Sequence, residues 1–304
     1  MAPDSSTSSQ SYVADPRNET VEIYVNGAFV PRAAATVSIF DAGFVLGDGV
    51  WEGLRLVKGR LLAIDDHMAR LYEGANAIRL DIGLTPAALV EEIWKTLRHN
   101  GMEDGVHIRL MITRGIKSTV NQDPRFVTGG PTIVIVAEYK RPNPAIKQTG
   151  LRLMTSAIRC STPDVFDLRL NSHSRLNFIR ALIQAIDMGA DEALMLDDRG
   201  FVASCNSTNF FILRGRELWT STGACCFNGI TRAKVIALWR AAGETVREAD
   251  FTMAEVYAAD EAFVTGTLGG VTPVRSIDGR LVGTGLPGVV TGEIAGLYAQ
   301  AIGE

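Results

Sequence analysis

The chain is poor in lysine and cysteine, and it has no long apolar run. Its 304 residues include six lysines against 24 arginines. No apolar run approaches the ~20 residues that cross a bilayer, so we expect no membrane contact. The 30 basic residues do not exceed the 34 acidic ones. This balance argues against nucleic acid as a partner.

The four cysteines, Cys160, Cys205, Cys225 and Cys226, show no CxxC spacing and have no histidine at zinc-ligand distance. We therefore expect no metal site and a reduced, cytoplasmic protein. The first 20 residues are polar and rich in serine, and they lack the basic start and apolar stretch of a secretory signal. We interpret residues 1–20 as a disordered tail.

Apolar residues make up 46% of the chain and charged residues 21%, which are values of a globular protein with a core. The length suits one large domain or two of roughly 150 residues. The polar segment 141–149 holds two prolines and is the best candidate for a linker. We expect a small α/β domain at 21–140 and a larger domain at 150–304, in an α+β fold.

Local patterns place elements in the first half. Asn26-Gly27 predicts the turn of a hairpin within residues 21–40, and Lys58-Gly59 predicts a second hairpin after a glycine-rich loop. Apolar spacing predicts helices at 66–81 and 85–100, the second starting at Thr85-Pro86. Residues 106–114 and 131–139 are apolar and favour strands.

The second half alternates in the same way. We expect a strand at 151–158, a helix at 174–188, two hairpins, and a helix from Thr231 to Gly243. A short helix and a strand follow within residues 251–267. For the helix at 174–188 we expect a buried face made of Leu176, Ile179, Leu182, Ile183 and Ile186.

Six motifs follow one another in a recognisable order. They are DAGFVLGDGVWEGLR (41–55), DDHMARLYEGA (65–75), HIRLMITRG (107–115), GADEALMLDDRGFVASCNSTNFF (189–211), NGITRAKV (228–235) and ADEAFVTGTLGGVTPV (259–274). Together they resemble the class IV aminotransferases, which are fold-type IV pyridoxal-phosphate enzymes that include branched-chain and D-amino-acid aminotransferases. The resemblance covers residues 21–295. It implies a two-domain, D-amino-acid aminotransferase-like fold in a homodimer, with the cofactor between the domains.

The resemblance also implies a phosphate site. Arg70 matches the family's phosphate-binding arginine, and a guanidinium fork suits phosphate oxygens. Ile230 and Thr231 match a phosphate cup at a helix start, where backbone N–H groups face the anion. Thr267 matches a further phosphate donor.

Other matches concern the substrate, expected to be an amino acid, an amine or a keto acid. Leu268 and Gly269 follow Thr267 along the expected substrate wall. Phe44 and Trp51 fall where the family has aromatic residues near the substrate, although both types also occur in cores. Arg109 matches an arginine of the branched-chain enzymes, and Arg114 matches a carboxylate-binding arginine of the D-amino-acid enzymes. Because these two matches come from different branches, they do not settle the substrate.

The chain departs from the family at the position of the catalytic lysine. A transaminase needs a lysine that forms a Schiff base with the cofactor and then carries a proton. A gapless alignment places that position at Asn171, and no lysine lies between Lys147 and Lys234. The family's glutamate, which keeps the pyridine nitrogen protonated, aligns with Ser204. A hydroxyl carries no charge, so the ring would be a weaker electron sink.

Three explanations remain open. The chain is an altered enzyme that binds pyridoxal or pyridoxamine 5'-phosphate non-covalently, a binder of a phosphorylated ligand that no longer transaminates, or a protein with an engineered or misread lysine site. A lyase-like activity, known in the same family, normally needs the lysine too. Lys117 is a candidate substitute lysine, although a surface role is typical of such residues, and His173 is a candidate base near Asn171.

Overall fold

The computed structural model describes residues 8–304, which divide into two compact units. The smaller unit consists of Ala14–Arg141 and Leu170–Arg175. The larger unit consists of residues 8–13, Pro142–Arg169 and Leu176–Glu304. The short segment 170–175 therefore belongs to the smaller unit, although it lies far along the sequence. Within residues 8–304, no helix has the length and apolar character that crossing a membrane requires.

The smaller unit is built on a six-stranded sheet with the order β3-β2-β7-β6-β4-β5, paired antiparallel throughout. Its strands are β2 (Glu22–Val25), β3 (Ala28–Pro31), β4 (Gly49–Val57), β5 (Arg60–Leu61), β6 (Val106–Thr113) and β7 (Thr132–Tyr139). Its helices are η1 (Pro16–Glu19), η2 (Arg32–Ala34), α1 (Ala42–Leu46), α2 (Ile64–Ala77), α3 (Pro86–His99) and η3 (Pro124–Phe126).

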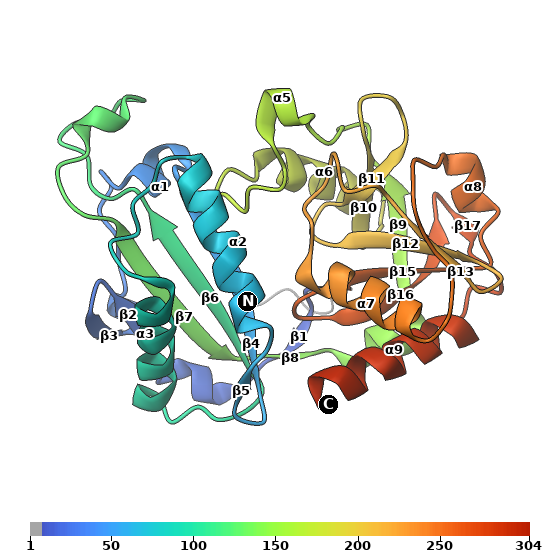
Figure 1. Cartoon of the computed structure of the whole chain (residues 1–304), viewed down its shortest axis with the longest axis horizontal. Coiled ribbons are helices and arrows are strands. Elements are labelled where there is room, and N and C mark those ends of the chain that lie inside the picture. The colour runs from blue at the N-terminus through green and yellow to red at the C-terminus, as the bar shows by residue number, and fades with distance from the viewer. Residues whose placement is uncertain (1–7) are drawn as a thin grey trace. The chain divides into compact units, whose positions relative to one another are not determined.

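Helices α2 and α3 cover one face of this sheet, α2 over β4 and α3 over β7 and β2 (Figure 1). The sequence dictates where α3 begins, because the Thr85 side chain accepts a hydrogen bond from the Ala88 N–H and proline occupies the first turn. Along β4, β6 and β7, alternate residues such as Leu54, Ile108 and Ile135 are fully buried under the helices. The residues between them lie on the opposite face.

The larger unit contains a mixed sheet with the order β11-β10-β9-β16-β15-β12-β13-β14, and β17 pairs with β16. Its strands are β9 (Leu151–Thr155), β10 (Glu192–Leu196), β11 (Val202–Cys205), β12 (Asn209–Arg214), β13 (Glu217–Thr220), β14 (Val246–Glu248), β15 (Glu261–Gly266), β16 (Gly270–Ile277) and β17 (Arg280–Leu281). Strands β1 (Tyr12–Val13) and β8 (Arg141–Pro142) form a two-stranded sheet of their own.

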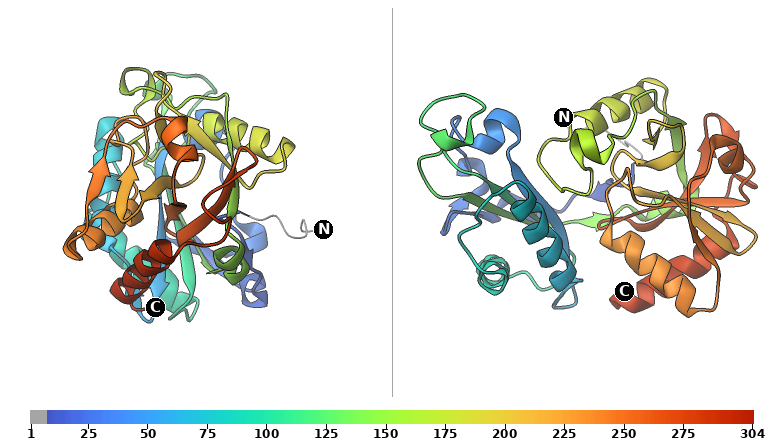
Figure 2. Two further views of the ribbon diagram at one scale, coloured as in Figure 1. Left: turned by 90° about the vertical axis from the view of Figure 1, so that its right-hand side faces the viewer. Right: turned by 45° about the horizontal axis from the view of Figure 1, so that its top comes forward.

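Six helices accompany this sheet. They are α4 (Pro144–Thr149), α5 (Pro163–Phe166), α6 (Leu176–Asp187), α7 (Ile230–Ala241), α8 (Met253–Tyr257) and α9 (Val289–Ile302). Helix α6 packs on β10 and β9, whereas α7 and α9 lie side by side and contact β15 (Figure 2). Every residue of β10 is buried, which is typical of a strand covered on both faces.

Most predicted elements are confirmed, including both early hairpins, the helices at α2, α3 and α7, and the strands at β6 and β7. The chain passes from the smaller to the larger unit between Arg141 and Pro142, inside the predicted linker 141–149. This segment forms β8 and α4, because Asn143 caps a helix that begins at Pro144. One local prediction was wrong. The predicted disordered tail is structured from residue 8 to residue 20, which contain β1 and η1. Residues 1–7 of that prediction lie outside the described part of the chain.

The predicted buried face of α6 was also wrong. Leu176, Ile179, Ile183 and Ile186 are 51 to 69% exposed. Phe178, Ala181 and Ala185 are the buried residues of this helix instead. Alanine has a short side chain that lets a helix approach a sheet closely, so this face packs and the face of larger residues points outward.

Candidate functional site

A buried carboxylate anchors two side chains of α2 in the smaller unit. Glu52 on β4 is 0% exposed and accepts hydrogen bonds from Arg70 Nε (2.8 Å) and Arg70 Nη2 (2.6 Å). Nδ1 of His67 lies 2.7 Å from the second oxygen of Glu52. Burial alone would raise the pKa of Glu52, but the hydrogen bonds from Arg70 and His67 outweigh it and lower the pKa. Arg70, the predicted phosphate ligand, is therefore held in a fixed orientation.

Residues 171–173 lie along the free edge of β4. Trp51 N–H donates to the Asn171 carbonyl, and the Asn171 side-chain amide donates back to the Trp51 carbonyl at 2.5 Å. The His173 N–H donates to the Gly49 carbonyl. Arg175 donates to the Asn171 side-chain oxygen at 2.5 Å. The nitrogen and the oxygen of the Asn171 side-chain amide are thus both hydrogen-bonded within the smaller unit, and the side chain is 4% exposed.

His173 has a buried ring nitrogen that bonds to nothing in the described chain. Its Nε2 has no hydrogen-bond partner. Burial, followed by the charge of Arg109, lowers the pKa of His173. The imidazole is therefore neutral at pH 7, which is the form that a proton acceptor needs.

Two arginine side chains lie over the ring of Trp51. The Arg109 guanidinium carbon lies 3.8 Å from the centre of a Trp51 ring, and that of Arg175 lies 5.7 Å away. The Trp51 indole N–H donates to the Ser172 carbonyl at 3.0 Å, which fixes the ring. Burial, and then repulsion from Arg109, lowers the pKa of Arg175 to about 10. The sequence placed Trp51 and Arg109 near the substrate, and the structure brings these two together.

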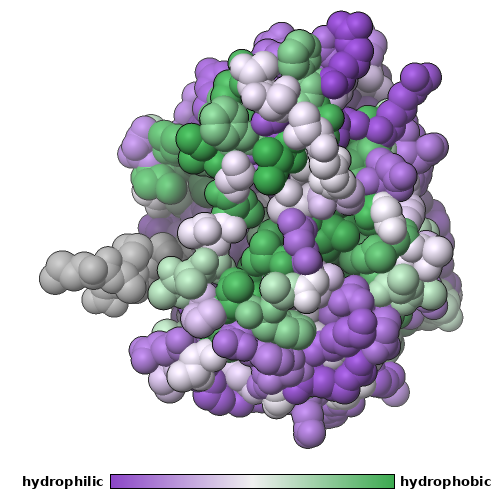
Figure 3. All heavy atoms as spheres, turned by 90° about the vertical axis from the view of Figure 1, so that its left-hand side faces the viewer, coloured by the Kyte–Doolittle hydropathy of each residue, from purple (hydrophilic) through white to green (hydrophobic). Residues whose placement is uncertain are grey.

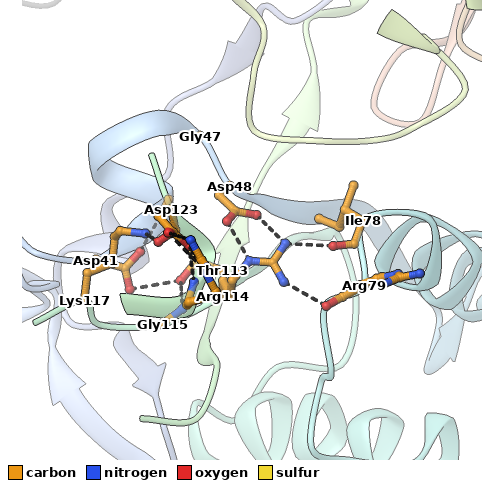
Figure 4. Close-up of polar contacts among 12 residues, drawn as sticks. Asp41, Gly47, Asp48, Ile78, Arg79, Thr113, Arg114, Gly115, Lys117 and Asp123 are labelled. Carbon is orange, nitrogen blue, oxygen red and sulfur yellow. Dashed lines mark hydrogen bonds and ion pairs between the residues drawn. The ribbon is translucent and has the colours of Figure 1, made fainter. Parts of the chain in front are cut away.

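Arg114, by contrast, is fully engaged (Figure 4). Its Nε and Nη2 donate to the two carboxylate oxygens of Asp48, at 2.6 and 2.9 Å. Its other bonds go to the carbonyls of Ile78 and Arg79, both at 2.8 Å. Since every nitrogen of the guanidinium already donates, the arrangement favours a structural role for this side chain, which ties β6 to the end of α2.

Lys117 and Phe44 lie in quite different settings. Lys117 is 4% exposed, and its Nζ donates to the Asp123 carbonyl at 2.7 Å, so it is not a surface lysine (Figure 4). Phe44, on the short helix α1, is 69% exposed. Neither side chain is in a contact that identifies a substrate.

In the larger unit, the start of α7 presents free N–H groups. The helix follows Gly229, which offers no side-chain cap, and in the described chain the N–H groups of Ile230, Thr231 and Arg232 have no acceptor. The Gly229 N–H donates to the Asn209 side chain at 3.2 Å. Free N–H groups and the helix dipole together favour an anion at this point.

A buried hydroxyl lies on the same side of the sheet. Thr265 on β15 is paired directly with Asn209 on β12, and paired residues point to the same face. Thr265 is 2% exposed, and its hydroxyl has no hydrogen-bond partner within residues 8–304. An unsatisfied buried hydroxyl costs about 1–3 kcal/mol, so a ligand oxygen here would remove a real penalty.

The turn after β15 contains the predicted residues Thr267, Leu268 and Gly269. Thr267 is half-buried, and the other two are buried. A Cβ atom at Gly269 would lie 3.1 Å from the Ser9 carbonyl oxygen, so the N-terminal segment packs closely on this turn. No pattern in the sequence indicated this contact, because residues 1–20 have the composition of an unstructured tail.

Ser204, the residue predicted to face the pyridine nitrogen, forms a hydrogen bond within its own turn. Its hydroxyl donates to the Thr208 carbonyl at 2.7 Å, and the side chain is 4% exposed. The oxygen retains acceptor capacity but has no charge to offer. Nearby, Glu192 is 0% exposed and accepts hydrogen bonds from Ser9 and Thr208, and burial raises its pKa.

Sequence reasoning missed Glu52, His67, Asn209, Thr265 and Glu192. One signal was available for Glu52: it occupies a core-facing position in the alternation of VWEGLRLV, where an acidic residue needs a partner. Its partner His67 lies within the DDHMARL motif. The bonds of Glu192 to Ser9 span 183 positions, and no local pattern predicts them.

The comparisons with known proteins agree with this architecture. A family model described as Amino-transferase class IV matches residues 49–277. The chain is 39% identical over 272 residues to a putative branched-chain-amino-acid aminotransferase of Methanocaldococcus jannaschii, with 89% of this chain and 93% of that protein covered. It is 37% identical over 285 residues, 94% of its length, to branched-chain-amino-acid aminotransferase-like protein 2 of Arabidopsis thaliana. The chain spans only about half (51%) of that relative.

Solved structures give the same result. The branched-chain aminotransferase of the archaeon Thermoproteus uzoniensis, solved with norvaline, superposes with a TM-score of 0.83 at 29% identity, covering 93% of this chain and 94% of that one. The Escherichia coli branched-chain enzyme gives a TM-score of 0.85 at 26% identity, covering 92% and 95%. The fold is that of the fold-type IV aminotransferases. The chain belongs to the class IV aminotransferase family.

Proposed function

We propose that the chain binds pyridoxamine or pyridoxal 5'-phosphate non-covalently and acts as an aminotransferase-like protein on an amino acid, an amine or a keto acid. The observation that carries the proposal is the start of α7, with three acceptor-free N–H groups and the orphaned hydroxyl of Thr265 on the same side. A bound phosphate would offer acceptor oxygens to the N–H groups and to the hydroxyl. A solved branched-chain relative in complex with pyridoxamine 5'-phosphate supports the same choice of ligand.

The residues present fit such a group in a specific way. Ile230, Thr231 and Thr267 would hold the phosphate, and Ser204 would lie at the ring nitrogen, as the family resemblance implies. Arg70, oriented by Glu52, would add a cation. The bound group supplies an exchangeable amine or aldehyde and an electron-withdrawing ring.

The distribution of lysines supports the non-covalent mode of this proposal. No lysine occurs between Lys147 and Lys234, and the Asn171 amide is committed to Trp51 and Arg175. We propose that His173, whose Nε2 is unbonded and whose ring is neutral, holds the proton that a lysine amine would otherwise move. Lys117 is a weaker candidate, because its amine already donates to a carbonyl.

The test is a titration with each vitamer. We expect saturable binding, seen in the cofactor absorption band and in tryptophan fluorescence, and no adduct after borohydride treatment. Thr265→Val should weaken binding about tenfold or more, as expected for loss of one hydrogen bond to a charged group. Thr284→Val, at an exposed position of the same unit, is the matched control. A borohydride-trapped lysine adduct would overturn the non-covalent mode.

A second candidate function is a binding protein that does not transaminate. Ser204 favours it, because a hydroxyl that donates to a carbonyl cannot stabilise a protonated ring as a carboxylate does. Half-reactions between the pyridoxamine form and a panel of 2-oxo acids separate the two. Conversion to the aldehyde well above the protein-free rate eliminates this alternative.

We also propose that the protein is a homodimer, because two apolar surfaces of the single chain are exposed to solvent and a second copy would bury them. One lies on the smaller unit, where residues 37–46 run beside residues 115–128, and Figure 3 shows apolar side chains gathered on one face. The other is the outward stripe of α6. Such patches on soluble proteins commonly mark interfaces. Ile183→Glu should lower the mass measured by light scattering towards a monomer, and Val289→Glu, at an exposed position outside these two surfaces, should not.

A further inference from the structure

The segment at residues 8–13 is fixed to the larger unit by its own polar groups. The Ser11 N–H donates to the Ser8 carbonyl at 2.9 Å, and the Ser11 carbonyl accepts from the Asn143 N–H at 3.1 Å. The Asn143 side chain at the same time caps α4. The ends of a chain are commonly disordered unless such bonds hold them. We refer to residues 8–13 as the strap.

Ser9 is the residue of the strap that enters the interior of the unit. It is 5% exposed, and its N–H donates to Oε1 of Glu192 at 3.2 Å. Its hydroxyl donates to the same oxygen, and the Thr208 hydroxyl donates to Oε2 at 2.8 Å. Glu192 is 0% exposed, and burial raises its pKa. Because a buried carboxyl group is costly without donors, the strap stabilises the interior that holds it.

Thr208, the other partner of Glu192, lies in the turn between β11 and β12. Its carbonyl accepts a hydrogen bond from the Ser204 hydroxyl at 2.7 Å. The next residue, Asn209, accepts a hydrogen bond at 3.2 Å from the N–H of Gly229, directly before α7. A continuous series of contacts therefore runs from the strap to Ser204 and to the start of α7.

The strap also lies close to the turn between β15 and β16. A Cβ atom at Gly269 would lie 3.1 Å from the Ser9 carbonyl oxygen and 2.9 Å from the Thr272 hydroxyl oxygen. A Cβ atom at Gly266, the last residue of β15, would lie 3.4 Å from the methyl carbon of Thr208. The two turns that contain residues assigned to the cofactor by the family resemblance therefore pack against each other and against the strap.

We propose that the strap is part of the ligand site, and that Ser9 and Glu192 are positioning residues that hold both turns in place for an anion bound at the start of α7. The identity of the ligand rests on the proposed function, whereas the hold of the strap on the turns does not. Neither residue touches the reacting group. Each acts through Thr208 and the turn at Gly269.

Release of the strap would have a cost at the ligand site. It would remove the two hydrogen bonds that Ser9 donates to Glu192 and admit water beside the Thr208 hydroxyl. The turns after β11 and after β15 would then be free to move. A ligand that has to order these turns as it binds loses affinity, because part of its binding energy offsets their conformational entropy.

Coupling between the strap and the ligand has to be reciprocal. If the docked strap tightens binding of the ligand, the bound ligand favours the docked strap by the same factor. A residue with a purely structural role would lower the stability of the whole unit without this mutual effect. Protection of the strap by a ligand is therefore the signature of a positioning role.

The experiment is hydrogen–deuterium exchange on the full chain, read at residues 8–13, 203–210 and 263–272. It is run without ligand, with pyridoxamine 5'-phosphate and with inorganic phosphate. We expect either ligand to slow exchange in the strap of the wild type. Ser9→Leu places a bulky side chain at a buried position, so it should speed exchange in both turns without ligand. The same variant should bind pyridoxamine 5'-phosphate about tenfold more weakly, the factor expected when hydrogen bonds to a buried group are lost.

Conservative variants and a control test the same contacts. Ser9→Ala keeps the N–H bond to Glu192 and should weaken binding by only about threefold. Glu192→Gln keeps an acceptor oxygen and should retain the affinity of the wild type, whereas Glu192→Leu should behave like Ser9→Leu. Val13→Thr, at a 54% exposed position of the strap, should change neither exchange in the turns nor affinity. Far-UV circular dichroism shows which variants fold.

The outcomes separate this inference from the proposed function. Unchanged exchange of the two turns in Ser9→Leu overturns the inference, and so does a bound ligand that leaves exchange in the strap unchanged. If the full chain binds neither pyridoxamine 5'-phosphate nor phosphate, the proposed function fails. The ligand-free comparison of Ser9→Leu with the wild type then decides alone whether the strap holds the turns. Should the Glu192 variants not fold, the Ser9 variants decide, because they change a terminal segment.

Discussion

The buried ion pair between Glu52 and Arg70 yields a sharp prediction for Glu52→Gln. The carboxylate is fully buried, the Arg70 side chain is 15% exposed, and His67 adds a third member. Removing one partner of a buried pair costs about 3–5 kcal/mol, because the other charge stays buried without compensation. Glutamine keeps one acceptor oxygen and Arg70 keeps some solvent contact, so we expect the low end, about 3 kcal/mol.

Urea denaturation followed by tryptophan fluorescence measures this loss, with Trp51 as a probe next to Glu52. The Glu91→Gln variant is a suitable control, since its ion pair with Arg98 is exposed and should contribute little. A double variant, Glu52→Gln with Arg70→Met, should recover part of the loss, because no charge is then left unpaired.

The effect should depend on pH with a definite sign. The pKa of Glu52 is lowered in the folded state, so its stabilisation is present above the pKa of the unfolded chain and is lost as the pH falls through the folded pKa. The difference between the wild type and Glu52→Gln should therefore shrink in acid. A loss no larger than that of Glu91→Gln at pH 7, or one that does not shrink in acid, would refute the reasoning.

Three further predictions use other buried groups. Glu192→Gln should be at least as stable as the wild type at pH 7. Burial raises the pKa of Glu192 in the folded chain, so the stabilisation by its protonated form is complete below the unfolded pKa and is lost as the pH rises through the folded pKa. Thermal unfolding at pH 4 and pH 8 checks this prediction. Thr265→Val should leave the cofactor-free stability unchanged or slightly higher in urea, because its hydroxyl has no partner to lose. Asn171→Lys should lower the free energy of unfolding by about 1–3 kcal/mol, because the hydrogen bonds to Trp51 and Arg175 are lost. The same variant should form an adduct with pyridoxal phosphate that borohydride traps. A variant that binds no cofactor would contradict the proposed function.

The sequence predicted those elements that local chemistry determines. Asn26-Gly27 gives a hairpin because Asn26 adopts a φ of 48° and Gly27 one of 90°, which few residue pairs tolerate. The start of α3 follows from Thr85 and the proline after it in the same way. Such signals act within four residues and do not depend on the rest of the fold.

Periodicity located α6 but misjudged its orientation. The helix has an apolar stripe of large residues and a second face of Phe178, Ala181 and Ala185. A hydrophobic pattern shows that a face is apolar, not whether this chain or another one covers it. The distinction depends on how closely the helix approaches β9 and β10, which single-sequence patterns do not encode.

The motifs found the candidate site, whereas the partners of its residues came only from the structure. Ser204 and Thr231 stand within sequences that carry the family resemblance. Glu192 and Ser9 meet across most of the chain, and Asn171 joins β4 from a segment 120 positions away. Chain topology brings such pairs together, and no spacing in the sequence reveals them.

The arginines of the smaller unit are sorted by whether the protein itself supplies an acceptor. Arg70 donates to Glu52, Arg114 to Asp48, and Arg175 to Asn171, so each is held by an oxygen of the same unit. Arg109 stacks on an indole and has no such oxygen within the described residues. Arg109 is therefore held by stacking on Trp51, whereas the other three are held by hydrogen bonds. The motif in the sequence singled out Arg109, but only the structure shows this difference in how its side chain is held.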